Sequence, residues 1–194
     1  MLLRSGFFSR MPQLETPRLL LRKLTLADAQ DIYAYSKDPE VSRHVLWEAH
    51  RSIHDSRAYL RYLQRLYRND EPASWGIVWK QTGQVIGTVG YMWWNQENNS
   101  AEVGYSLSRD FWNRGIMTEA LMEVMRFGFE VMRLHRIEAQ HEVDNPASGR
   151  VMVKAGMRYE GCLRGRIYNK GRYVDIALYA MLAEDRPTRA LRSL

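Results

Sequence analysis

The sequence predicts a single α+β domain, and three observations lead to this prediction. The chain has 194 residues, of which 45% are hydrophobic, which suits one core with short tails. Runs with strand periodicity and runs with helical periodicity follow the order βααβββαβαββ, which gives about seven strands and about four helices. The sequence contains no internal repeat and no linker, so one domain is the simplest count.

Two capping boxes organise the first half of the chain. Thr25 and Ser52 are each followed three residues later by an aspartate, which is the spacing that begins a helix. The segment between the two helices, residues 41–51, reads as irregular. The expected elements of this half are a strand at 17–24, helices at 25–36 and 52–68, and a meander of strands at 75–80, 85–94 and 102–107.

The pattern of the second half of the sequence predicts a long central helix, a shorter helix and a final hairpin. Apolar residues recur at helical spacing from Met117 to Met132. Asn145 and Pro146 suit the N-cap and first position of the next helix, and Gly156 suits the position past its end. The expected elements are helices at 116–132 and 145–156 and strands at 136–143, 157–168 and 172–181.

The two ends of the chain are expected to lie outside the domain. Residues 1–13 carry an apolar patch too short for a signal peptide, and we expect them to form an N-terminal arm. Residues 183–194 are polar and are expected to form a loose tail after a domain at 14–182. No apolar run approaches transmembrane length, so no membrane contact is expected.

The composition favours a basic protein in a reducing compartment. The net charge of +6 favours polyanionic partners such as nucleic acid, ribosomes or phosphorylated cofactors. Cys162 is the single cysteine, so no intrachain disulfide can form, which fits the cytoplasm. Cys162 itself is either a nucleophile or a buried small apolar residue.

A stripe of arginines runs along the second expected helix, at positions 57, 61, 65 and 68. This spacing places all four on one side of a helix. The stripe is either a surface for an acidic partner or an ordinary solvated face.

The residues from Glu102 to Glu119 have a pattern that is typical of an anion-binding site. It reads as a strand, a basic loop that contains Gly115, and the beginning of the central helix. A helix N-terminus exposes unpaired N–H groups and a partial positive charge, and glycine lets the backbone approach a ligand closely. An ordinary strand-to-helix crossover would show the same pattern.

Metal and triad chemistry find little support in the sequence. His135 and His141 do not have a ligand spacing, and no H-E-x-x-H motif is present, so no metal is expected. The G-x-S-x-G motif of a serine nucleophile is also absent.

The order of elements and several motifs together resemble the GNAT superfamily of N-acetyltransferases, in particular its RimJ/RimL-like branch, which acetylates N-termini of ribosomal proteins. The resemblance covers roughly residues 14–182 and is more specific than any single motif. The motifs that carry it are Ala101–Tyr105, Phe111–Ala120, Asp144–Ser148, Lys154–Met157, Glu160–Gly161, Asp175 and Tyr179–Ala180.

The resemblance implies acetyl-CoA as the acetyl donor and a mixed, mostly antiparallel sheet with splayed central strands. The family's pyrophosphate loop falls on Trp112–Met117, where Gly115 matches and Trp112 and Met117 depart from the strict pattern. Asn145 and Ser148 look like later CoA contacts, although a helix cap and a first-turn polar residue explain them equally. The implied cofactor-binding residues are Tyr105, Ser106, Leu107, Asn113, Arg114, Gly115, Met117, Thr118, Asn145 and Ser148.

Acetyl transfer to an amine needs a base, a stabilised oxyanion and a proton for the departing thiolate. Glu102 is the expected base, and a plain carboxylate at the rim of the sheet is its alternative role. Ser148 is expected to protonate the thiolate, with Tyr168 as the alternative acid. We expect direct attack by the amine rather than an acyl-enzyme on Cys162, because no base stands beside that cysteine in the sequence.

The acceptor is the least determined part of the prediction. The expected acceptor is the N-terminal α-amine of a ribosomal type of protein, with a small amine, amino acid or antibiotic as an alternative. A non-catalytic RNA- or ribosome-binding module is the alternative of another class, and the protein is expected to be a monomer or homodimer. A position in the hydrophobic core is the alternative for part of the expected acceptor pocket. This pocket is formed by His44, Trp47, Trp75, Tyr91, Trp93 and Trp94.

Overall fold

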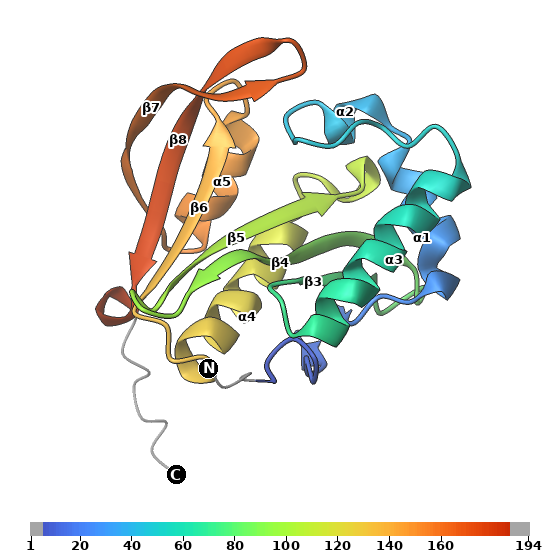
Figure 1. Cartoon of the computed structure of the whole chain (residues 1–194), viewed down its shortest axis with the longest axis horizontal. Helices are drawn as coiled ribbons and strands as arrows, with labels where there is room; N and C mark the ends of the chain where they lie inside the picture. Colours follow the sequence, from blue (N-terminus) through green and yellow to red (C-terminus); the bar gives the residue numbers. More distant parts are fainter. Residues whose placement is uncertain (1–5, 187–194) are drawn as a thin grey trace.

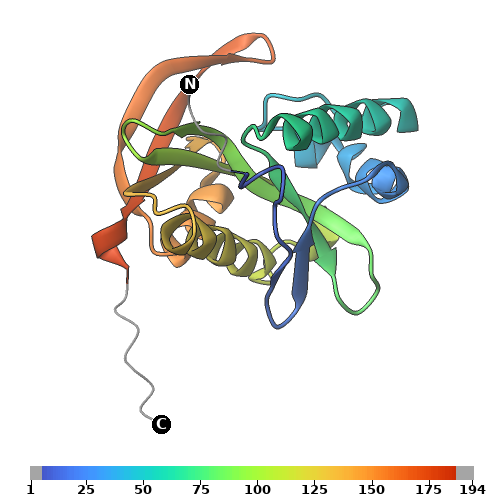
Figure 2. The same ribbon diagram turned by 60° about the horizontal axis from the view of Figure 1, so that its bottom comes forward.

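The computed structural model describes residues 6–186, which form one mixed sheet with helices on both faces (Figures 1 and 2). The eight strands lie in the order β1-β2-β3-β4-β5-β6-β8-β7. Neighbouring strands are antiparallel except β5 and β6, which are parallel. The strands are β1 (Leu14–Glu15), β2 (Leu19–Arg22), β3 (Ser74–Trp79), β4 (Val85–Asn95), β5 (Ser100–Leu107), β6 (Arg136–Glu142), β7 (Arg158–Asn169) and β8 (Arg172–Leu182).

The helices divide between the two faces of this sheet. Figure 2 shows α3 on one face and α4 on the other, with α1 beside α3. α5 lies behind β6 in Figure 1. The helices are α1 (Ala29–Ser36), α2 (Pro39–Ser42), α3 (Ile53–Asn69), α4 (Ile116–Glu130) and α5 (Pro146–Lys154), with short 3-10 turns at Leu26–Asp28, Arg109–Phe111 and Ala183–Asp185.

The expected α+β class and order of elements are confirmed, with two additions. The short strand β1 adds to the seven expected strands, and the short helix α2 begins at Pro39 and extends into the segment 41–51 that was expected to be irregular. Asp38 accepts a hydrogen bond from the N–H of Glu40, and Pro39 occupies the first turn of α2. The residues that end α1 therefore also begin α2, which is why the sequence shows only the break.

β5 and β6 separate along their length, as the family resemblance implies. They pair only from Ser100 to Glu102, opposite Arg136 to Glu138. Beyond that point β6 continues its pairing with β8 alone, while β5 stays paired with β4. The two parallel strands therefore diverge from an apex at Glu102, and Figure 1 shows the widening between them.

One part of the hydrophobic core, which extends to both faces of the sheet, lies between β3, β4 and α4. The Trp75 ring is fully buried and packs against Phe127 at 5.3 Å between ring centroids. Tyr91 is also fully buried, and its hydroxyl donates a hydrogen bond to the Val124 carbonyl. Aromatic rings therefore join the centre of the sheet to α4 and hold that helix in place.

The described part of the expected N-terminal arm packs on this core. Phe8 is fully buried and lies against Tyr91. The Asp70 carboxylate accepts backbone hydrogen bonds from Gly6, Phe8 and Ser9, which fixes the segment to the end of α3. Residues 1–5, and residues 187–194 of the expected polar tail, lie outside the described residues.

Candidate functional site

The beginning of α4 has the geometry that the sequence suggested for an anion site. Gly115 is the N-cap of α4 and has a φ of +70°, a conformation that favours glycine. A Cβ at this position would meet only an Arg18 nitrogen, at 3.7 Å, so the space in front of the helix is open. The first N–H groups of a helix have no partner within it. α4 therefore presents these donors beside an uncrowded glycine.

Arg114 and Met117 take different positions around this helix start. The Arg114 guanidinium lies over the rings of Trp79, at 5.5 Å, and Phe111, at 5.1 Å. Met117 is buried in the core, so it offers only its backbone to a ligand, whereas Asn113 is exposed. A large residue at position 117 is compatible with the loop because its side chain points inward.

Glu119 ties the beginning of α4 to the turn between β1 and β2. Its carboxylate accepts hydrogen bonds from the Thr16 hydroxyl at 2.5 Å and from the Arg18 guanidinium at 2.6 Å. Burial raises the pKa of Glu119, but the hydrogen bonds from Thr16 and Arg18 outweigh burial and lower it below the ordinary value. Arg18 also donates to the Arg114 carbonyl at 3.0 Å, so this brace supports the loop itself. The brace was not expected from the sequence, because Arg18 is more than 90 residues from Arg114 and Glu119.

Tyr105 and Ser148 meet across the widening gap between the strands. The Tyr105 hydroxyl donates to the Ser148 carbonyl at 3.0 Å and lies 2.9 Å from the Ser148 hydroxyl. Asn145 accepts the N–H of Ser148 at its side chain and caps α5, which is the structural role foreseen for it. Burial raises the pKa of Tyr105, so its hydroxyl stays protonated at neutral pH.

Ser106 and Leu107 lie on either side of β5. The Ser106 hydroxyl faces Thr88 of β4 at 3.1 Å, and the Leu107 side chain is buried. Both side chains therefore have protein partners, and their backbone groups are what they offer to the gap.

Glu102 stands at the apex where β5 and β6 part. Its carboxylate accepts hydrogen bonds from the Trp93 indole N–H at 2.7 Å and from the Gln140 amide at 3.1 Å. Burial raises the pKa of Glu102, and the neighbouring Glu138 adds to this, while the two hydrogen bonds act against it. Gln140 was not expected to be a site residue. It lies two residues beyond Glu138, which pairs with Glu102, so the two-residue period of the strand places Gln140 on the same face as Glu138.

The expected acceptor residues separate into core and surface groups. Trp75 and Tyr91 have no exposed area, so the expectation that they line an acceptor pocket is corrected: they hold α4 against the sheet. Trp94 packs against Phe7 and Phe8 of the N-terminal segment. The remaining candidates are Trp93, which contacts Glu102, together with His44 and Trp47 on the segment after α2.

A buried carboxylate fixes the segment after α2 to the tip of the β7–β8 hairpin. Glu142 is 4% exposed and lies 3.0 Å from the His44 ring nitrogen. It also accepts hydrogen bonds from the Asn169 amide at 2.5 Å and from Arg172 at 3.2 Å. Lys170 adds hydrogen bonds to the carbonyls of Ser42 and Trp47. This cluster was not expected from the sequence, because its members come from segments about 100 residues apart.

The comparisons with known proteins decide the family. Residues 18–158 match the family model described as an acetyltransferase (GNAT) domain. The chain belongs to the GNAT family of acetyltransferases. A Bacillus licheniformis protein named uncharacterized N-acetyltransferase p20 is 33% identical over 175 residues, which are 90% of this chain and 98% of that protein.

Two further relatives carry more specific names. The Escherichia coli [ribosomal protein uS5]-alanine N-acetyltransferase is 25% identical to this GNAT chain, with 93% of this chain and 96% of that protein covered. A solved structure of RimL, titled as the ribosomal L7/L12 α-N-protein acetyltransferase in complex with coenzyme A, has a TM-score of 0.81. Its 20% identity, over 90% of this chain and all of that one, shows the fold alone.

This GNAT protein is an acetyl-CoA-dependent N-acetyltransferase, and acetyl-CoA supplies the acetyl group as a thioester. The residues at the beginning of α4 fit such a phosphorylated cosubstrate. The positive φ of Gly115 and the open space around it leave the helix N–H groups accessible. Among the described residues, no cluster of His, Cys, Asp or Glu side chains suits a metal ion. Nor does any helix within residues 6–186 have the length and apolarity needed to cross a membrane.

Two other residues of the GNAT enzyme lie away from the apex. Tyr168 is 63% exposed, and its ring packs edge-on against Tyr173 at the end of the β7–β8 hairpin. Cys162 is exposed on the edge strand β7, which corrects the expectation that it is buried.

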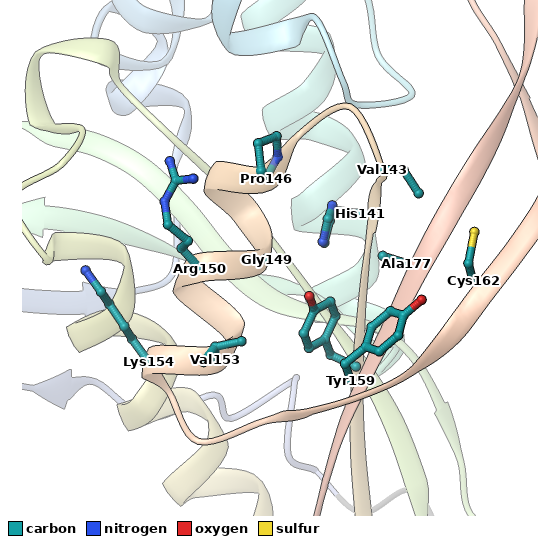
Figure 3. A pocket seen from close by; sticks show the side chains of 11 residues that line it. His141, Val143, Pro146, Gly149, Arg150, Val153, Lys154, Tyr159, Cys162 and Ala177 are labelled. Carbon is teal, nitrogen blue, oxygen red and sulfur yellow. The ribbon is translucent and has the colours of Figure 1, made fainter.

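A hollow of about 510 Å³ lies between α5 and the β6–β8–β7 part of the sheet (Figure 3). Gly149, Arg150 and Val153 of α5 line it, with His141 and Cys162 from the strands. Ser148 lies on the opposite side of α5, because it is offset from Gly149 and Val153 by helical geometry. The hollow is therefore separate from the gap that Tyr105 and Ser148 bridge.

Proposed function

We propose that this enzyme acetylates the N-terminal α-amine of a protein, of the ribosomal-protein type, by direct attack of the amine on acetyl-CoA. The observation that carries the proposal is the position of Glu102, a half-buried carboxylate at the apex of the diverging strands with a raised pKa. The name of the uS5-alanine relative supports the class of acceptor. We propose the cytoplasm as its location, in keeping with a single free cysteine.

Glu102 suits the removal of a proton from an α-amine. An α-amine has a pKa near 8, whereas a lysine amine has one near 10.4, so the α-amine is the easier group to deprotonate. Burial makes Glu102 a stronger base than an exposed carboxylate. In the proposed step, the amine nitrogen bonds to the acetyl carbon, and its proton passes to Glu102, directly or through a water. The carbon–sulfur bond breaks as the new carbon–nitrogen bond is completed.

Ser148 is the proposed donor of a proton to the departing thiolate. Its hydroxyl lies 2.9 Å from the Tyr105 hydroxyl, which remains protonated because burial raises its pKa. The Tyr105 hydroxyl donates a hydrogen bond to the Ser148 carbonyl, so it is placed to accept one from the Ser148 hydroxyl and orient it. Ser148 then regains its proton from water. Tyr168, the other proposed acid, lies on the exposed end of the hairpin, and within residues 6–186 its hydroxyl has no hydrogen-bond partner.

The proposed binding of acetyl-CoA uses two parts of the gap. The helix start at Arg114, Gly115, Met117 and Thr118, with Asn113, is proposed to hold the pyrophosphate. From Tyr105 to Leu107, β5 pairs with β4 but no longer with β6, and its edge toward β6 is proposed to hold the pantetheine arm, with Asn145 and Ser148 on the other side.

A thiol-release assay tests the acceptor. The substrates are one peptide with a free N-terminus, the same sequence with a blocked N-terminus and an internal lysine, and a panel of small amines including amino acids. We expect CoA release with the first peptide and little with the second. Release with small amines alone would replace the proposed acceptor by the small-molecule alternative. Release with the blocked peptide would show a lysine acetyltransferase instead.

A further inference from the structure

The outward side of α3 carries positive charge without any acidic counterpart. Arg57, Arg61, Arg65 and Arg68 are all exposed, and at 100° per residue they fall within an 80° arc. The buried side chains of α3, centred on Leu60 and Leu63, occupy the opposite side. The four arginines therefore form one straight line of about 16 Å along the helix. In Figures 1 and 2, α3 lies at the outside of the molecule.

Among the described residues, these four arginines lack ion pairs, as exposed Arg164 and Arg166 also do, but only these four are aligned along one side of a long helix. Within residues 6–186, none of the four approaches a carboxylate within 4.0 Å. On the other long helix, α4, Arg126 pairs instead with Glu123 and Glu130. A solvated helix face is commonly laced with such pairs, so four unpaired arginines in a line favour an external anionic partner.

An aromatic ring beside the line narrows the class of partner. Tyr62 is 49% exposed, and the Arg65 guanidinium lies 5.3 Å from its ring centroid. Single nucleic-acid strands are bound by guanidinium groups along the backbone and by exposed aromatic rings on which bases stack. An acidic peptide satisfies the arginines but has no base to place on Tyr62.

We propose that this arginine face of α3, defined by Arg57, Arg61, Tyr62, Arg65 and Arg68, binds a single strand of nucleic acid through its phosphates. The face lies on the side of the sheet opposite α4, so a bound strand leaves the beginning of α4 accessible (Figure 2). The inference does not depend on the acceptor, because binding is measured without acetyl transfer.

Salt dependence of RNA binding provides the test. The wild-type protein is titrated into a labelled single-stranded RNA of mixed sequence, and fluorescence anisotropy is measured between 50 and 200 mM salt. Each phosphate contact contributes about 0.7 to the slope of log K against log salt for a single strand. The double variant Arg61→Gln/Arg65→Gln is therefore expected to lower the slope by about 1.4.

A control variant removes the same number of positive charges from another surface of the protein. Arg164 and Arg166 are exposed on β7 and also lack ion pairs among the described residues, so Arg164→Gln/Arg166→Gln removes two charges far along the sheet. We expect this control to retain the wild-type slope. Equal losses in both double variants would show a general charge effect and overturn the proposal.

Two further measurements separate the nucleic acid from other partners. Tyr62→Ala is expected to weaken RNA binding by about tenfold at constant salt.

A polyglutamate peptide of equal charge is the probe for an acidic protein, and binding as tight as that of RNA would overturn the proposal. Absence of RNA binding at 50 mM salt would do the same. An unchanged thermal response to acetyl-CoA in each variant shows that the fold and the cosubstrate site are intact.

Discussion

At the scale of single residues, the environment of Glu102 gives a carboxylate the properties of a base. Its two neighbours, Trp93 and Gln140, orient the carboxylate and favour its charged form, while burial favours the neutral form. The balance leaves its pKa above the ordinary value. A base with a raised pKa holds the amine proton more strongly, provided that the carboxylate is charged when the amine arrives.

Replacement of Glu102 tests this role. Glu102→Gln keeps the shape of the side chain, and its oxygen still accepts the Trp93 N–H, but the proposed base is removed, so we expect kcat to fall by about 10²–10⁴-fold. Acetyl-CoA should still raise the melting temperature of the variant. The wild-type kcat should fall as the pH drops through the raised pKa of Glu102, and this acidic limb should vanish in the variant. Unchanged turnover would remove Glu102 as the base.

Trp93→Phe is the matched control for that pH profile. It removes the indole N–H that stabilises the charged carboxylate, so the pKa of Glu102 should rise further. The acidic limb of kcat should therefore move to higher pH while the base remains present. A shift to lower pH would contradict the assigned hydrogen bond.

Two substitutions of Gly115 separate the effect of its backbone conformation on stability from the effect of its surroundings on acetyl-CoA binding. Gly115→Ala meets no atom closer than 3.7 Å, but its φ of +70° costs a side-chain-bearing residue about 1–2 kcal/mol. We expect lower stability with acetyl-CoA binding retained. Gly115→Glu adds a negative charge beside the proposed pyrophosphate position, so binding should be lost. Calorimetric titration with acetyl-CoA distinguishes the two variants.

At the scale of elements, the β7–β8 hairpin and the segment after α2 are joined by one carboxylate. Glu142 contacts His44 on the segment after α2, and Asn169 and Arg172 at the tip of the hairpin. Hydrogen bonds of a buried charged group are worth more than those at the surface, so this cluster sets how the two segments face each other. The hairpin itself was expected from the Asn169–Gly171 turn, but its partner segment was not.

Removal of the Glu142 carboxylate should affect binding of the acceptor peptide but not binding of acetyl-CoA. Glu142→Ala leaves three polar partners unsatisfied and should lower the free energy of unfolding by about 1–3 kcal/mol. We also expect a raised KM for the peptide and an unchanged affinity for acetyl-CoA. Asp144→Asn is the control, because Asp144 is an exposed partner of the same Arg172 and should have little effect. Weakened acetyl-CoA binding in Glu142→Ala would contradict the separation of the two sides.

At the scale of the whole molecule, the sheet divides the structure into two sides that meet at the apex. α4 and α5 lie with the proposed cosubstrate groups, and α1 and α3 lie on the other face (Figure 2). The parallel pairing of β5 and β6 ends at Glu102, which is the place where the two sides connect. This arrangement suits a ternary complex in which the donor and the acceptor approach from different faces.

Binding of acetyl-CoA should stabilise the molecule as a unit. A ligand at 100 times its Kd adds about 2.7 kcal/mol to the free energy of unfolding, which corresponds to about 5–10 °C for a domain of this size. Thermal shift with acetyl-CoA, CoA and ATP in parallel measures this effect. We expect both CoA forms to stabilise and ATP to have a weaker effect; no response to acetyl-CoA would contradict the cosubstrate assignment.

The sequence by itself determined the α+β class, the order of the helices and strands, and the glycine at the beginning of α4. These features depend on local periodicity, capping and backbone freedom, which are written in neighbouring residues. The motifs around Gly115 and Asn145 also led to the GNAT resemblance, which the family match confirmed.

Only the tertiary structure decided which of several equivalent side chains are buried and which meet. Trp75 and Trp93 have the same chemistry and similar strand contexts, yet one packs against Phe127 and the other donates to Glu102. Likewise, Glu119 meets Arg18, and Glu142 meets His44, across about 100 residues of chain. The physical reason is that burial and long-range contacts depend on how the elements pack, which local sequence patterns do not encode.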